Sequence, residues 1–161
     1  MPKIQQRDFY FGAGLSMFFK HNKDSRPTLL ESVDKKSKLF SMTTDTSEEF
    51  YVYMKYTEKE QPSKGENSHK WHFPLTSTEK NILDECINSK LKVYIILICG
   101  SAPLKTGEIA ILSQKEYEKI KNKTSITVKL PKNGKKFTIP DSGGPIRIDT
   151  NRIEMKLTEI D

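Results

Sequence analysis

The residues best suited to chemistry in this sequence are lysines near its C-terminal end. Positions 119 to 136 contain no Asp or Glu, and the helix and hairpin predicted there place several ammonium groups at the two ends of the hairpin. Ammonium groups bind phosphate as point charges, and each contact with a nucleic-acid backbone releases counterions. The segment is therefore a candidate nucleic-acid-binding surface, although lysines also protect an edge hairpin from pairing with other chains. Its lysines are Lys119, Lys121, Lys123, Lys129, Lys132, Lys135 and Lys136.

Other reactive side chains form no recognisable catalytic set. His69 and His72 have a spacing found in metal sites, but no Cys or further His lies near them, so we predict surface histidines and no bound metal. No Ser or Cys stands beside a base in a nucleophile motif, and no glycine-rich phosphate loop occurs. The sequence therefore favours a non-enzymatic binding protein that needs no cofactor.

The elements that position these residues are organised around positions 91–100, LKVYIILICG. This run is apolar and rich in β-branched residues from Val93 to Cys99, which is typical of a strand covered on both faces. We predict it to be the middle strand of one mixed sheet. Three antiparallel strands (28–33, 38–44 and 50–57) precede it, and helices are predicted at 8–20, 76–89 and 113–120. The segment 58–70 is predicted to be a surface loop.

The C-terminal third contains the best-defined local feature, a β-hairpin. Apolar residues alternate over 126–130 and 137–139, and Asn133-Gly134 between them suits a tight turn. Together the elements predict an α/β (α+β) single domain spanning 1–161. Its central sheet carries helices on its faces in a core at 8–100, and a strand, helix and hairpin follow at 101–161.

The third predicted strand alternates clearly, and the two faces differ in character. An open sheet face with aromatic and cationic side chains could stack bases. The first helix needs a sheet face to cover, so core packing under that helix is the prediction for the tyrosines. Gly12 and Gly14 are predicted to let the helix approach closely. One face of the strand has Phe50, Val52, Met54 and Tyr56, and the other has Tyr51, Tyr53 and Lys55.

The order helix, three strands, helix, strand over residues 8 to 100 resembles the core of the restriction-endonuclease-like PD-(D/E)XK superfamily. The resemblance implies a nuclease in which carboxylates hold Mg²⁺ and a lysine helps to position the attacking water. Lys55 stands at the position of that lysine, whereas Tyr53 stands where the family pattern has an acid. The resemblance therefore rests on element order, and the acids of the motif are not matched.

Acids for such a site would have to come from elsewhere in the chain. Hairpin geometry places Lys55 opposite about Leu39, and then Asp45 lies roughly 20 Å away along the strand. Glu31 or Asp34 on the first strand could approach Lys55 in an unusual register. A divergent metal-dependent nuclease built from Glu31, Asp34 and Lys55, with Mg²⁺ as its cofactor, is the first alternative function.

The overall charge agrees with an anionic partner. Lys and Arg number 27 against 21 Asp and Glu, giving a formal charge of +6 and a pI of about 9.2. Such a balance favours nucleic acid or an acidic protein surface. Cys86 and Cys99 occupy apolar positions and are predicted to be buried free thiols in the cytoplasm, and no apolar run is long enough to span a membrane. A small inhibitor or adaptor of a mobile element, binding a host enzyme, is the second alternative.

Overall fold

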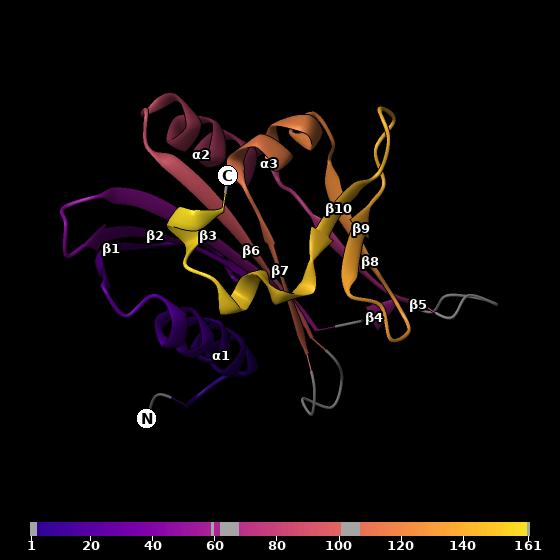
Figure 1. The fold of residues 1–161 in the computed structure, drawn as a ribbon, viewed down its shortest axis with the longest axis horizontal. Coiled ribbons are helices and arrows are strands. Elements are labelled where there is room, and N and C mark those ends of the chain that lie inside the picture. The colour runs from indigo at the N-terminus through magenta and orange to yellow at the C-terminus, as the bar shows by residue number, and fades with distance from the viewer. Residues whose placement is uncertain (1–2, 59, 62–67, 101–106, 161) are drawn as a thin grey trace.

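The computed structural model describes residues 3–58, 60–61, 68–100 and 107–160. In these residues two five-stranded β-sheets pack together with three α-helices (Figure 1). The α+β class is confirmed, but two sheets are present where the sequence predicted one. Residues 101–106, for which the sequence predicts a loop before the next strand, lie outside the described residues.

The first sheet has the strand order β1-β2-β3-β6-β7. β3 and β6 are parallel, and the other neighbouring strands are antiparallel. The predicted central strand, β6, thus lies between β3 and β7 and is buried from Val93 to Cys99. The strands are β1 (Ser25–Asp34), β2 (Ser37–Thr44), β3 (Glu49–Thr57), β6 (Lys92–Cys99) and β7 (Glu108–Leu112).

The helix α1 (Gln6–His21) covers one face of the first sheet, and the alternation predicted for β3 is confirmed. A Cβ atom at Gly14 would lie 2.7 Å from Ile98, so the close approach predicted for this glycine is confirmed. Gly12 has nothing within 4 Å of such a Cβ atom, so the same prediction is wrong there. On the other face of β3, Tyr53 is buried as predicted and Tyr51 is partly buried, but the second sheet and the later helices cover this face rather than α1.

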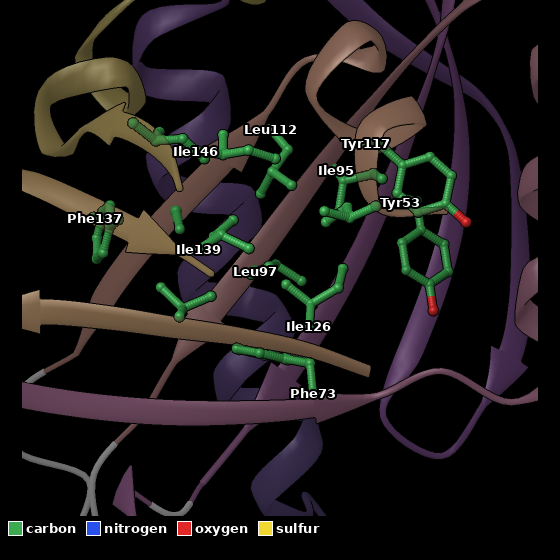
Figure 2. Close-up of a cluster of buried hydrophobic side chains, with 14 of the residues drawn as sticks. Tyr53, Phe73, Ile95, Leu97, Leu112, Tyr117, Ile126, Phe137, Ile139 and Ile146 are labelled. Carbon is green, nitrogen blue, oxygen red and sulfur yellow. The ribbon is translucent and has the colours of Figure 1, made fainter. Parts of the chain in front are cut away.

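The second sheet has the order β10-β9-β8-β5-β4. Its pairs are antiparallel, and its apolar face packs against the first sheet to form the larger core (Figure 2). The hairpin from β8 to β9 is confirmed, and Asn133 has the positive φ of 61° that its turn requires. The strands are β4 (Glu60–Gln61), β5 (Ser68–Pro74), β8 (Ser125–Pro131), β9 (Lys136–Ile139) and β10 (Ile146–Asp149).

The loop predicted over 58–70 is therefore wrong in part. Residues 60–61 and 68–70 are strand, and residues 59 and 62–67 lie outside the described residues. The polar composition of 68–70 concealed the strand, because one face of β5 is open to solvent and its pairing with β8 is a long-range contact.

Two capping boxes begin the remaining helices, and the sequence already indicates them as Thr76-x-x-Glu79 and Ser113-x-x-Glu116 at the starts of the predicted helices. Thr76 caps α2 (Ser77–Asn88) and Ser113 caps α3 (Gln114–Ile120), each by accepting a backbone N–H in the first turn. The chain then closes with the short 3₁₀ helices η1 (Thr150–Glu154) and η2 (Leu157–Glu159), of which η2 docks through Leu157. None of the helices in the described ranges has the length and apolar character needed to cross a membrane.

Candidate nucleic-acid interface

The outer face of the second sheet carries polar and cationic side chains, whereas its inner face is apolar. On β5, Trp71 and Phe73 point into the core, and Lys70 and His72 alternate with them on the outer face, where they are only half-buried. The same alternation on β8 places Lys129 outward beside Val128. The outer face is thus a polar surface, and the apolar inner face behind it packs into the core.

A row of four side chains, three of them cationic, crosses this outer face from strand to strand. Lys70 lies directly opposite Lys129, Lys129 lies opposite Thr138, and Thr138 lies opposite Arg147. Neighbouring strands are about 4.8 Å apart, so the row spans roughly 14 Å. Like charges placed directly opposite each other destabilise a sheet. Neither Lys70 nor Lys129 forms an ion pair with a carboxylate of the described chain.

A groove of about 530 Å³ runs beside the Lys70–Lys129 pair. Lys123 lines it too, but its ammonium donates to the Pro140 carbonyl and lies 3.8 Å from Asp141. The rest of the wall is mostly polar and includes Asn122, Thr124, Ser125 and Thr127. Ammonium and hydroxyl groups around one groove suit an anionic ligand whose oxygens accept hydrogen bonds.

The lysines predicted from the sequence are only partly brought together. Lys123 and Lys129 line the groove, whereas Lys119 and Lys121 are exposed at and after the end of α3. Lys132 and Lys135 are exposed in the β8–β9 turn, and Lys136 lies 3.7 Å from Asp149. Segment 119–136 contains no acid of its own, but Asp141 and Asp149 from later in the chain lie close to two of its lysines, Lys123 and Lys136.

Two cations of the row were missed by the sequence reasoning, Lys70 and Arg147. Both occupy polar positions of strands whose inward neighbours are buried, such as Trp71 and Ile148. The alternation Lys70, Trp71, His72, Phe73 was the available signal. From residue 71 onward this alternation predicts an extended segment with Trp71 and Phe73 in the core, but Lys70 joins the surface only through the β5–β8 pairing that places it against Lys129.

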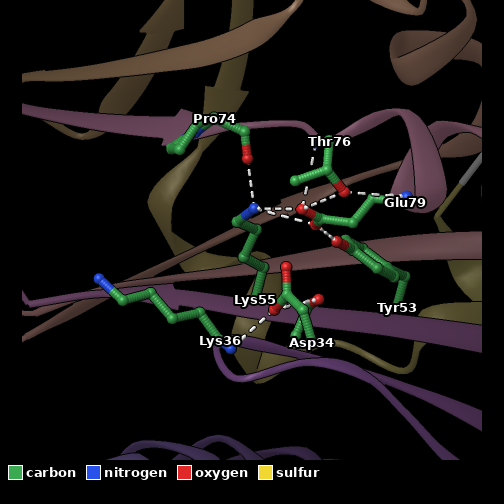
Figure 3. Close-up of polar contacts among 8 residues, drawn as sticks. Asp34, Lys36, Tyr53, Lys55, Pro74, Thr76 and Glu79 are labelled. Carbon is green, nitrogen blue, oxygen red and sulfur yellow. Dashed lines mark hydrogen bonds and ion pairs between the residues drawn. The ribbon is translucent and has the colours of Figure 1, made fainter.

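A second polar cluster, at the end of β3, corresponds to the predicted nuclease alternative. Lys55 is 3% exposed, and its ammonium lies 2.9 Å from each carboxylate oxygen of Glu79, which is fully buried (Figure 3). Lys55 also donates to the Pro74 carbonyl, and Tyr53 donates its hydroxyl to Glu79. Burial, followed by the nearby Glu79 carboxylate, raises the pKa of Tyr53 far above its usual value, so the phenol stays protonated as a donor.

The β-strand register differs from the one predicted for this cluster. Lys55 lies opposite Ser37 on β2, rather than opposite Leu39, and Ser37 lies opposite Asp34 on β1. Asp34, Ser37 and Lys55 therefore form one row across three neighbouring strands. An irregularity in β1 between Ser32 and Asp34 produces this placement. A pocket of about 340 Å³ includes Asp34, Lys55 and Glu79 in its lining.

The remaining acids named from the sequence lie outside this pocket. Glu31 is exposed and lies opposite Leu39, and Asp45 contacts Arg26. The second acid near Lys55 is instead Glu79 of α2. Its only sequence signal was the capping box that begins at Thr76, which the structure confirms.

The cluster does not fit a resident Mg²⁺ ion in the described arrangement. Both Glu79 oxygens accept hydrogen bonds from Lys55, and Asp34 accepts from the Lys36 N–H at 2.7 Å and the Ser37 hydroxyl at 2.9 Å. Mg²⁺ requires octahedral oxygen ligation at close range and would have to displace the Lys55 ammonium. Among the described residues, no group of three or more His, Cys, Asp or Glu side chains could hold a metal.

The histidines and cysteines have the environments predicted for them. His69 stacks on Trp71 and contacts Glu60, while His72 lies on the outer face. Cys86 and Cys99 are free and buried, and burial raises the pKa of Cys86 to about 11.

Comparison with known proteins gives no relatives for this chain. No family model, no curated protein and no solved structure matches it.

Proposed function

We propose that this chain is a non-enzymatic binding protein that holds nucleic acid by its phosphates on the outer face of the second sheet. The observation that carries the proposal is the direct opposition of Lys70 and Lys129 on neighbouring strands. Two like charges held half-buried in this register repel each other, and a phosphate between them would turn the repulsion into attraction. The repulsion between Lys70 and Lys129 destabilises the sheet without a ligand, and a bound phosphate would remove this destabilisation.

The rest of the face supports the same ligand. Arg147 continues the row, and Thr127 and Ser125 offer hydroxyl groups to phosphate or sugar oxygens. The net charge of +6 would attract any polyanion from a distance. Nucleic acid is favoured over an acidic protein surface because the cations form a line, which suits the regularly spaced phosphates of one backbone. Two buried free thiols agree with a reducing, cytoplasmic location for this function.

The test is binding of a fluorescent 20-nucleotide oligonucleotide by anisotropy over a series of salt concentrations. The double variant Lys70→Gln/Lys129→Gln should weaken binding and flatten the salt dependence, by about 0.7 to 0.9 in the logarithmic slope for each phosphate that is no longer neutralised. The matched control is Lys119→Gln/Lys121→Gln, which removes the same charge near α3. Equal effects of the two double variants, or no binding at low salt, would refute the proposal.

The nuclease alternative makes a different prediction for the Lys55 cluster. It would require Lys55 to leave Glu79 so that Asp34 and Glu79 could take up Mg²⁺. Magnesium-dependent cleavage that is abolished in Lys55→Ala would favour it. A stable complex with a host enzyme, without affinity for nucleic acid, would favour the inhibitor or adaptor alternative.

A further inference from the structure

The outer face of the second sheet presents one aromatic ring next to its cations. His72 follows Lys70 by two positions on β5, so both side chains share the outer face. His72 lies opposite Thr127, whose hydroxyl is 3.4 Å from the Nδ1 atom of the ring. The imidazole is half-buried against the sheet. A ring placed in this way can offer a surface to a ligand without entering the core.

The spacing of His72 from the cations suits one nucleotide. Two residues along a strand cover about 6.6 Å, so the ring lies one such step from the Lys70–Lys129 pair. A phosphate held by the two ammonium groups would leave its own base within reach of the imidazole. Aromatic side chains on an open sheet stack on bases in this way, because every base has an apolar face.

Stacking of this kind distinguishes single strands from duplexes. In a duplex the faces of the bases are occupied by neighbouring base pairs, whereas in a single strand a base can turn onto a protein ring. The groove lined by Lys70, Thr127 and Lys129 is walled further by 122–125 and Pro140, and Thr127 is the lining residue that contacts the ring.

We propose that the ligand of this face is single-stranded nucleic acid, with its backbone along Lys70, Lys129 and Arg147 and a base stacked on His72. The inference rests on the proposed function and adds the strandedness of the ligand and the role of His72. His72 supplies affinity by stacking and carries no phosphate contact, and the lysines supply the part that depends on salt.

The test compares two competitors in the anisotropy assay. One is a single-stranded 15-nucleotide oligothymidine, and the other is the duplex that this strand forms with complementary oligodeoxyadenosine. The single strand should bind about tenfold more tightly than the duplex. His72→Ala should weaken single-strand binding about five- to tenfold, while the logarithmic salt slope stays unchanged. His72→Phe should retain the affinity, because phenylalanine also stacks.

Two controls make the outcome decisive. His69→Ala changes a histidine of the same strand that packs on Trp71, and it should leave binding unchanged. An abasic oligonucleotide should bind the wild type and His72→Ala equally, since it has no bases to stack. Thermal unfolding of each variant shows whether it is folded.

The possible failures are distinguishable. Equal or tighter binding of the duplex would overturn the single-strand inference and leave the proposed function in place. The same would follow if His72→Ala, once shown to be folded, behaved like His69→Ala, or if His72→Phe reduced the affinity as much as His72→Ala. A wild-type chain that binds neither oligonucleotide at low salt would overturn the proposed function, and the inference with it.

Discussion

The buried ion pair between Lys55 and Glu79 allows a quantitative test of the structure. The two side chains are 4% and 0% exposed, and the ammonium lies 2.9 Å from both carboxylate oxygens. Removing one partner of a buried pair leaves an uncompensated charge and costs about 3–5 kcal/mol. We therefore expect Lys55→Met to lower the free energy of unfolding by about 3–5 kcal/mol, a large part of the roughly 5–15 kcal/mol of a whole domain.

The double variant Lys55→Met/Glu79→Gln separates the pair from its surroundings. The glutamine oxygen can still accept from Tyr53, and no charge remains buried, so the double variant should be more stable than Lys55→Met by about 1 kcal/mol or more. The assay is urea unfolding followed by circular dichroism, with an unchanged m-value as the check on two-state behaviour. The melting temperature of Lys55→Met should fall by about 6–20 °C.

A surface pair provides the control for this cycle. Arg26 lies 3.6 Å from Asp45, and both side chains are about 70% exposed, at 72% and 68%. Arg26→Met should cost no more than about 1 kcal/mol. A cost of Lys55→Met as small as that of this control would refute the importance of the buried pair. So would a double variant in which the separate costs of Lys55→Met and Glu79→Gln simply add.

Four further substitutions test other parts of the fold by the same unfolding assay. Gly12→Ala should stabilise α1 by up to about 1 kcal/mol. Gly14→Ala should be less stable than Gly12→Ala by about 1–3 kcal/mol, because its Cβ atom meets side chains of β3 and β6. Equal stabilities of the two variants would contradict the close packing at Gly14. Tyr117→Phe should raise stability by about 1 kcal/mol, because the buried Tyr117 hydroxyl has no hydrogen-bond partner among the described residues, and a decrease in stability would reveal a partner. Burial raises the pKa of Asp34, but hydrogen bonds from neighbouring donors outweigh this effect and leave the pKa below its usual value of 3.8. The stability that Asp34 supplies is therefore present above about pH 4 and disappears as the pH falls through the lowered pKa. Asp34→Asn should be less stable than wild type at pH 7 and about equal to it near pH 2. A difference in stability that persists unchanged at pH 2 would exclude this role.

Local patterns in the sequence were sufficient for most individual elements. Residue alternation identified β3, the capping boxes at Thr76 and Ser113 located α2 and α3, and Asn133 identified the hairpin turn. Each of these signals lies within a few consecutive residues, so the element can be identified without knowing how the rest of the chain folds. The same local argument was correct for Gly14 and wrong for Gly12, because which glycine faces the sheet depends on how α1 packs against β3 and β6.

Long-range pairing could not be predicted in this way. The second sheet depends on β5 pairing with β8, and the polar residues around Ser68 gave no indication of a strand. The approach of Asp34 to Lys55 depends on an irregularity in β1, and Glu79 reaches the same place from a helix. The candidate interface was therefore predicted in part, with Lys129 correct and its opposite neighbour Lys70 missed.

The most direct test of the proposed interface is an NMR titration of the ¹⁵N-labelled chain with a single-stranded 15-nucleotide oligothymidine. We predict that amide shifts concentrate at Lys70, His72, Thr127, Lys129 and Arg147, on the outer face of the second sheet. Shifts confined to α1, or to the pocket around Asp34 and Lys55, would contradict this interface.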